Sequence, residues 1–283
     1  MKKTILITGA SSGLGYEAAL QLARLQHEII LLCRDKERGE KAVRDIQSAS
    51  GNTSIHLYTA NLSSQVSISA AAEQIKSDFK HLDVLLNNAG GVFADFELSD
   101  AGLEMTIATN HFNYFWCTYY LLDLLKATKG SRIINVASDS HYSAKTIDFE
   151  RFFTKKRYFV LRAYEQSKLA NVLFTYKLAE KTKDLGIVVN ALHPGFVYTP
   201  IGTKGGNKFF SFVWDTASRL FGRTVEKGVN THLFLSTAEG AAAISGQYFF
   251  DCKPKPSSVI SYDKDLQDRL WEESEKISDL KFL

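Results

Sequence analysis

The sequence has few cysteines and no long apolar run. Its three cysteines, Cys33, Cys117 and Cys252, are odd in number and lack paired spacing, which argues against a disulfide framework and against a zinc site. The N-terminal MKKTILITGA is basic and then apolar, but its apolar run is short and breaks at Gly9, unlike a signal peptide. No stretch approaches the length of a membrane span. We therefore expect a cytoplasmic protein without a transmembrane segment and without a bound metal.

Prolines and an excess of one charge are also scarce. All four prolines lie at or beyond position 194, and no linker rich in proline, serine and glycine divides the chain. A single domain over 1–283 is therefore expected. The formal charge of +3 comes from mixed signs throughout, which provides no concentrated basic field for a nucleic acid.

Short apolar segments alternate with helical patterns along the chain. Apolar segments predict strands near 3–8, 28–33, 54–58, 82–87, 132–137, 187–192 and 247–250. Helical patterns follow the glycine turn through about Leu25 and then lie near 36–49, 64–79, 99–127, 162–184 and 224–237. Strands separated by helices predict the α/β class, as a Rossmann-like doubly wound parallel sheet with helices on both faces. Ligands of such sheets lie beyond the carboxyl ends of the strands.

The segment from Thr8 to Gly15 has glycines in the spacing G-x-x-x-G-x-G between a predicted strand and a predicted helix. Glycine allows the sharp turn and lets a pyrophosphate approach the N–H groups of the helix N-terminus. A glycine turn alone could be a simple helix cap, but the strand before it and the helix after it favour binding.

Four features stand in the order expected of the short-chain dehydrogenase/reductase family, which this chain resembles: Thr8 to Gly15, Asn87-Asn88-Ala89-Gly90, Ser138 and Tyr164-x-x-x-Lys168. Within the family, the chain is most similar to the retinol dehydrogenase and WW-domain oxidoreductase group. That likeness rests on Cys33-Arg34-Asp35, Thr109-Asn110-His111-Phe112, Ala163 to Phe174, His193-Pro194-Gly195 and Ser245 to Cys252.

The resemblance implies an oxidoreductase that transfers hydride between NADP(H) and a carbonyl or alcohol group of an apolar substrate, such as a retinal-like aldehyde or ketone. It divides the chain into a cofactor half at about 1–137 and a catalytic and substrate half at about 138–283. The cofactor-binding residues that it implies are Gly9, Ser11, Ser12, Gly13, Leu14, Gly15, Arg34, Asn61, Leu62, Asn88, Ala89, Gly90, Tyr164, Lys168, Pro194, Gly195, Val197 and Thr199.

The choice between NAD and NADP depends on the end of the second strand, where a carboxylate would hold a ribose hydroxyl and an arginine would hold a 2′-phosphate. A count of about twenty residues from Gly15 reaches Asp35, which favours NAD. The register favours NADP instead, because Cys33 takes the usual acidic position and Asp35 is placed to cap the next helix. Arg34 is then free for the phosphate. Asn61 stands where the family usually has aspartate, and its amide carbonyl could accept the same bond from adenine.

Tyr164 and Lys168 are four positions apart in a predicted helix and therefore share one face. A free tyrosine has a pKa of roughly 10, so it shuttles protons poorly at neutral pH unless a positive charge favours the phenolate. In the family's mechanism Lys168 supplies that charge. The resemblance assigns Ser138 to orient the substrate oxygen, with Ser140 as the competing candidate, and Asn110 to hold a water for proton relay.

Two segments carry many aromatic and basic residues. The insert 147–162 could form a pocket wall or a surface flap, and 200–222 could form a substrate lid, a subunit contact or a membrane contact. A homodimer or homotetramer is possible, because helices 99–127 and 162–184 are the usual pairing surfaces of the superfamily. The competing functions are a protochlorophyllide-reductase-like enzyme and a non-catalytic NADPH-sensing scaffold.

Overall fold

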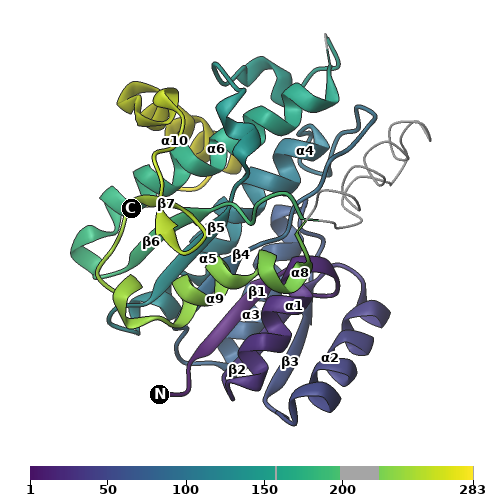
Figure 1. Ribbon diagram of the computed structural model, residues 1–283. Coiled ribbons are helices and arrows are strands. Elements are labelled where there is room, and N and C mark those ends of the chain that lie inside the picture. Colours follow the sequence, from purple (N-terminus) through teal and green to yellow (C-terminus); the bar gives the residue numbers. More distant parts are fainter. Residues whose placement is uncertain (157, 198–222, 283) are drawn as a thin grey trace.

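A computed structural model describes residues 1–156, 158–197 and 223–282 (Figure 1). In these residues, eight strands form one sheet in the order β3-β2-β1-β4-β5-β6-β7-β8. β1 to β7 are parallel, and β8 is antiparallel to β7. The strands are β1 Thr4–Thr8, β2 Glu28–Cys33, β3 Ile55–Thr59, β4 Val84–Asn87, β5 Arg132–Val136, β6 Val188–Leu192, β7 Gln247–Phe250 and β8 Lys253–Pro254. The predicted doubly wound, Rossmann-like α/β architecture is confirmed.

The helices cover both faces of the sheet. Helices α1 (Gly13–Arg24), α2 (Lys36–Ser50), α8 (Val225–Gly228) and α9 (Asn230–Thr237) gather on one side. Helices α3 (Gln65–Asp78), α4 (Met105–Ile107), α5 (Asn113–Lys126), α6 (Val160–Lys181) and α10 (Lys264–Ser278) gather on the other. None of the helices in the described part of the chain combines the length and apolarity that a membrane span requires.

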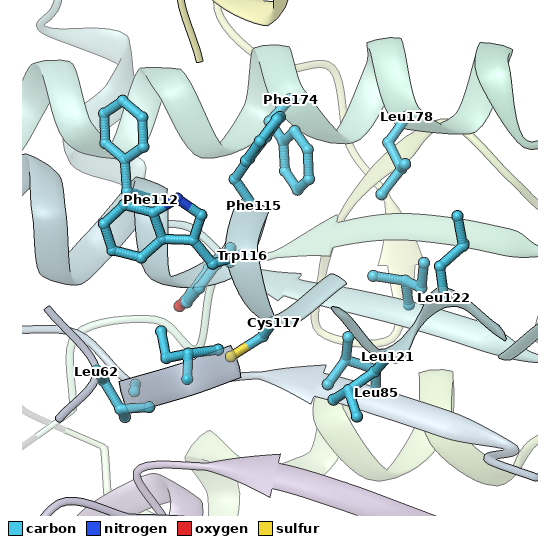
Figure 2. Packing of buried hydrophobic residues seen from close by; sticks show 14 of the residues in the cluster. Leu62, Leu85, Phe112, Phe115, Trp116, Cys117, Leu121, Leu122, Phe174 and Leu178 are labelled. Atoms are coloured by element: carbon cyan, nitrogen blue, oxygen red, sulfur yellow. The ribbon is translucent and has the colours of Figure 1, made fainter. Parts of the chain in front are cut away.

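Apolar packing on the two faces explains why the strands read as continuous apolar runs. Leu6 of β1 faces the core that α5 and α6 cover, while its neighbours Ile5 and Ile7 face the core that α1 covers. Figure 2 shows the first of these cores, in which Phe115 of α5 lies beside Phe174 of α6. Phe112, Tyr114, Phe115 and Trp116 are fully buried, as expected of core residues.

Two predicted helices differ from those in the structure. The helix expected at 99–127 begins only at Met105, because the Glu104 carboxylate accepts from the N–H groups of Thr106 and Ile107 and caps it there. A π-helical turn, Ala108–Phe112, then separates α4 from α5. The helix expected at 224–237 is two helices that meet at Val229.

The sequence did not predict β8 and α10. Asp263 caps α10 by accepting from Leu266 N at 3.0 Å, and Leu270 and Trp271 are buried on its inner face. The signal was an acidic cap followed by apolar residues at helical spacing within an otherwise charged segment. α10 lies along α6 and therefore covers part of the surface through which pairing was expected (Figure 1). A homodimer or homotetramer stays a prediction.

Candidate functional site

A cavity of about 450 Å³ lies at the carboxyl ends of the strands and contains most of the predicted cofactor residues. It is found where the strand order reverses between β1 and β4, which is the usual ligand position in such sheets. Its lining includes Gly9, Ser11, Ser12, Gly13, Leu14, Gly15, Arg34, Asn61, Leu62, Asn88, Ala89, Gly90, Tyr164, Lys168 and Pro194. The structure therefore brings together residues that were selected from six separate segments.

The glycines of the first turn allow it to pack against the loop after β4. A Cβ on Gly9 would lie 2.9 Å from Ala89 Cα, and a Cβ on Gly15 would lie 2.5 Å from Asn88 Nδ2. Thr8 Oγ1 accepts from the N–H groups of Asn88 and Ala89, each at 2.9 Å. Sequence analysis did not assign this bonding role to Thr8. These contacts fix the two loops on either side of the reversal point.

The N-terminus of α1 suits an anionic group. Ser12 is its N-cap, but the Ser12 side chain makes no capping bond, and the first turn holds no acidic residue. The first N–H groups of a helix have no partner within the helix and attract negative charge. Gly13 and Leu14 of this turn line the cavity, so a pyrophosphate could bind to the N–H groups here.

The far end of the cavity carries two arginines. Arg34 and Arg38 are both exposed and line the cavity, while Asp35 Oδ1 accepts from Arg38 N at 3.0 Å and caps α2. The predicted cap at Asp35 is confirmed. Arg38 was not predicted from the sequence, although its place one turn into a helix that follows Arg34 was a usable signal.

Asn61 is positioned differently from its expected use. Its Oδ1 accepts from Ser63 N at 3.2 Å and from Ser63 Oγ at 2.9 Å, so its carbonyl oxygen stabilises its own loop. Asn61 still lines the cavity, but the oxygen expected to meet adenine already has two donors.

Tyr164 and Lys168 lie one turn apart on α6 and face the cavity. Lys168 Nζ is 5.6 Å from the centroid of the Tyr164 ring and donates to the Val136 carbonyl at 3.0 Å. Burial lowers the pKa of Lys168 to about 7 and raises the pKa of Tyr164 to about 12. At neutral pH, Tyr164 therefore holds its proton and can donate it.

The hydroxyl of Ser138 lies close enough to Tyr164 to lower the pKa of Tyr164, while the nearby Asp139 raises it. Ser138 lies two positions after the end of β5 and caps a 3₁₀ turn, Asp139–Tyr142, by accepting from Ser140 N at 3.2 Å. Ser140 Oγ accepts from Ser138 Oγ at 3.1 Å. Of the two candidate serines, Ser138 is the one that the structure places on Tyr164.

Asn110 lies in the π-helical turn and uses its side chain to hold the loop after β4. Its Oδ1 accepts from Gly91 N at 2.7 Å, and its Nδ2 donates to Gly91 O at 3.0 Å and to Ser167 Oγ at 2.9 Å. A Cβ on Gly90 would lie 3.0 Å from Asn110 Oδ1. The side chain therefore anchors the loop, and the expected water relay stays a prediction.

An apolar wall completes the cavity beside Tyr164. It is formed by Val92, Phe93 and Met105, and Tyr158 of the insert donates to the Phe93 carbonyl at 2.7 Å. Glu104 Oε1 is a second acceptor for the Tyr158 hydroxyl, at 3.4 Å. The insert thus supports the cavity wall, which favours the first of its two expected roles.

The structure describes the segment after β6 only as far as Val197. Pro194 lines the cavity; Gly195, with φ +82°, and Val197 follow it without lining it. Val197 instead lies against the start of α8, where a Cβ on Gly228 would be 2.8 Å from its Cγ2. Thr199 and the segment 200–222 lie outside the described residues. Within the described ranges, no cluster of three or more His, Cys, Asp or Glu could hold a metal ion.

Comparison with known proteins places these features in context. The sequence model of the short chain dehydrogenase family matches residues 3–208. Retinol dehydrogenase 13 of Homo sapiens is 37% identical, over 99% of this chain and 85% of the human protein. Retinol dehydrogenase 12 of Mus musculus is 35% identical, over 95% of this chain and 84% of the mouse protein.

Solved structures show the same fold. An uncharacterised protein from Mycobacterium paratuberculosis matches with a TM-score of 0.79 at 27% identity, over 99% of this chain and 95% of that chain. L-sorbose reductase from Gluconobacter frateurii, in complex with NADPH and L-sorbose, matches with a TM-score of 0.70 at 22% identity, over 88% of this chain and 94% of that chain. The second likeness concerns the fold alone.

Proposed function

The chain belongs to the short-chain dehydrogenase/reductase family and is similar to its retinol dehydrogenases, and we propose that it reduces the carbonyl group of an apolar aldehyde or ketone with NADPH, reversibly. One observation carries the proposal: Tyr164 and Lys168 line the same cavity as Arg34 and Arg38, and Ser138 lies close enough to Tyr164 to lower its pKa. A cytoplasmic location is proposed with it, on the sequence alone.

The residues of the chain divide the work between binding and proton transfer. The N-terminus of α1 would bind the pyrophosphate, and Arg34 and Arg38 would bind the 2′-phosphate. NADPH, when bound, supplies the hydride to the carbonyl carbon. Tyr164 donates its proton to the carbonyl oxygen, and Ser138 orients that oxygen by a hydrogen bond. Lys168, in its protonated form, favours the tyrosinate that remains.

Cofactor preference tests the arginine end of the site. Replacing both Arg34 and Arg38 by alanine is expected to weaken NADPH binding by about 10- to 100-fold and to leave NADH binding nearly unchanged, because only NADPH carries the 2′-phosphate. The measurement is a fluorescence titration of each protein with both nucleotides. Lys36→Ala is the control, since Lys36 lies on the same exposed turn but outside the cavity lining. Equal or tighter binding of NADH by the wild type would refute the NADP preference.

Turnover decides between the enzyme and its rivals. NADPH oxidation measured against a panel of apolar aldehydes and ketones should give product alcohol in stoichiometric amounts. NADPH binding without turnover of any carbonyl would favour the sensing scaffold. Reduction of a carbon–carbon double bond alone would favour a protochlorophyllide-reductase-like activity.

The support from Tyr158 tests the apolar wall. Tyr158→Phe removes the bond to the Phe93 carbonyl and should raise KM for an apolar carbonyl several-fold, because the loss of one hydrogen bond is worth about 1 kcal/mol. NADPH affinity should stay unchanged. Tyr58→Phe makes the same chemical change at the surface, where the hydroxyl donates to Asp78, and serves as the control. An unchanged KM in Tyr158→Phe would show that the insert does not shape the substrate site.

A further inference from the structure

His141 connects the turn that carries Ser138 to a distant part of the chain. The ring is fully buried, its Nδ1 lies 2.6 Å from the Ser138 carbonyl oxygen, and its Nε2 lies 3.1 Å from Ser258 N. A carbonyl oxygen can only accept, so Nδ1 must carry the proton that it donates. The Ser258 N–H can only donate, so Nε2 must be the acceptor. Both partners therefore select the same neutral tautomer.

The surroundings of the ring keep it neutral. Burial lowers the pKa of His141; the Ser138 carbonyl and Asp139 raise it, and Lys255 lowers it. The rings of Tyr142 and Tyr248 pack against it at centroid distances of 4.1 Å and 4.8 Å. A neutral ring with one donor and one acceptor nitrogen is a rigid bridge between two backbone groups.

Ser258 belongs to a segment that follows β8 and packs against the turn at a second point. The Tyr142 hydroxyl donates to the Pro256 carbonyl, next to the bond between Ser258 and His141. The orientation of Ser138 is thus set both by its own turn and by a segment 117 positions from His141 along the sequence. Misplacing a catalytic group by about 1 Å can cost about 100-fold in rate, so this orientation matters to catalysis.

We propose that His141 is a positioning residue, which holds Ser138 by its carbonyl so that the Ser138 hydroxyl faces Tyr164, and that Ser258 N–H fixes the ring in the required tautomer. The proposal rests on the proposed function. It assigns a catalytic consequence to a C-terminal segment that lies beyond residues 3–208, the part matched by the family's sequence model.

The test uses two variants of His141. His141→Phe keeps a ring but removes both bonds, and kcat for carbonyl reduction should fall by about 10- to 100-fold with the Kd for NADPH unchanged. His141→Asn places an amide donor near the position of Nδ1 and should recover much of the loss. His232→Phe is the control, because it makes the same change at another fully buried histidine, on α9 at the opposite face of the sheet.

Two readouts separate positioning from a general loss of stability. The Ser138 hydroxyl lowers the pKa of Tyr164. Asp139, Lys168 and Tyr114 are also close to Tyr164. Loosening Ser138 should therefore move the pH profile of alcohol oxidation to higher pH. In a Ser138→Ala background, His141→Phe should have no further effect on kcat, because the two residues act through one contact. The proposal would be overturned if the losses in kcat from Ser138→Ala and His141→Phe multiplied in the double variant. It would also be overturned if His141→Phe left the pH profile of alcohol oxidation unchanged.

The wild-type protein gives an independent measurement if the variants do not fold. NMR of protein labelled with ¹⁵N-histidine should show His141 as the neutral Nδ1–H tautomer from about pH 6 to about pH 8. An Nε2–H tautomer or a charged ring would overturn the proposal. If the wild type reduces no carbonyl, the proposed function fails. The positioning role of His141 is then tested by ultraviolet titration of Tyr164. His141→Phe must then raise the pKa of Tyr164 as Ser138→Ala does, and an unchanged pKa would overturn the positioning role.

Discussion

Tyr164→Phe is expected to lower kcat for carbonyl reduction by about 10²- to 10⁴-fold, the range that positioned proton donors contribute. The variant keeps the ring and loses only the hydroxyl that Ser138 contacts. NADPH affinity should change little, because the residues proposed to bind its phosphates, in the turn from Gly9 to Gly15 and at the two arginines, are unchanged. The measurement is single-turnover NADPH oxidation under saturating carbonyl substrate. Tyr176→Phe is the matched control, a buried tyrosine of the same helix whose hydroxyl bonds to Ser257.

The same tyrosine predicts a different pH dependence for each direction of the reaction. Burial raises the pKa of Tyr164 to about 12, so the protonated form that carbonyl reduction needs persists through neutral pH. Alcohol oxidation needs the tyrosinate as base, so its rate should rise with pH across the whole neutral range. Both dependences should vanish from the residual activity of Tyr164→Phe. A wild-type oxidation rate that fell with rising pH would argue against Tyr164 as the base.

This pH dependence is also affected by the charge of Lys168. Burial lowers its pKa to about 7, so its positive charge is only partly present at neutral pH. An additional negative charge near Lys168 would favour its protonated form. Protonated Lys168 would in turn favour the tyrosinate form of Tyr164. The charge of Lys168 is therefore expected to affect the apparent pKa that a rate profile reports for Tyr164.

The sequence predicted those parts of the site that depend on local order along the chain. The glycine turn could be recognised because a strand precedes it and a helix follows it, and Tyr164 and Lys168 could be paired because helical spacing puts them on one face. Each of these inferences needs only a few consecutive residues. The strands could be predicted equally well from the sequence, because burial on both faces leaves them almost uniformly apolar.

Contacts between distant segments could not be predicted in this way. Thr8 binds the loop at Asn88, 80 positions away, and Tyr158 binds Phe93, 65 positions away. No local pattern encodes which backbone group a side chain will meet. For the same reason, the sequence did not predict that the Asn110 side chain forms hydrogen bonds with Gly91 and Ser167. Sequence predicts which residues surround the cavity better than it predicts their bonding partners.

The largest expected loss of stability comes from α10, which was not predicted from the sequence. Trp271 of α10 is 4% exposed, stacks on Phe174 at 5.9 Å between ring centroids, and also meets Phe115 and Phe282. Trp271→Ala should lower the free energy of unfolding by about 3 to 5 kcal/mol, because it removes this packing and leaves a cavity. The measurement is urea unfolding followed by circular dichroism.

A control in the same part of the chain separates packing from a general sensitivity of the C-terminal segment. Val259 is 89% exposed, so Val259→Ala should leave the unfolding free energy within about 0.5 kcal/mol of the wild type. A loss below about 1 kcal/mol in Trp271→Ala would mean that α10 opens without the rest of the fold. α10 also bonds the turn that carries Asn110, since Ser274 Oγ lies 2.9 Å from His111 Nε2. Loosening this helix should therefore weaken catalysis as well as stability, which joins the C-terminal helix to the reacting end of the cavity.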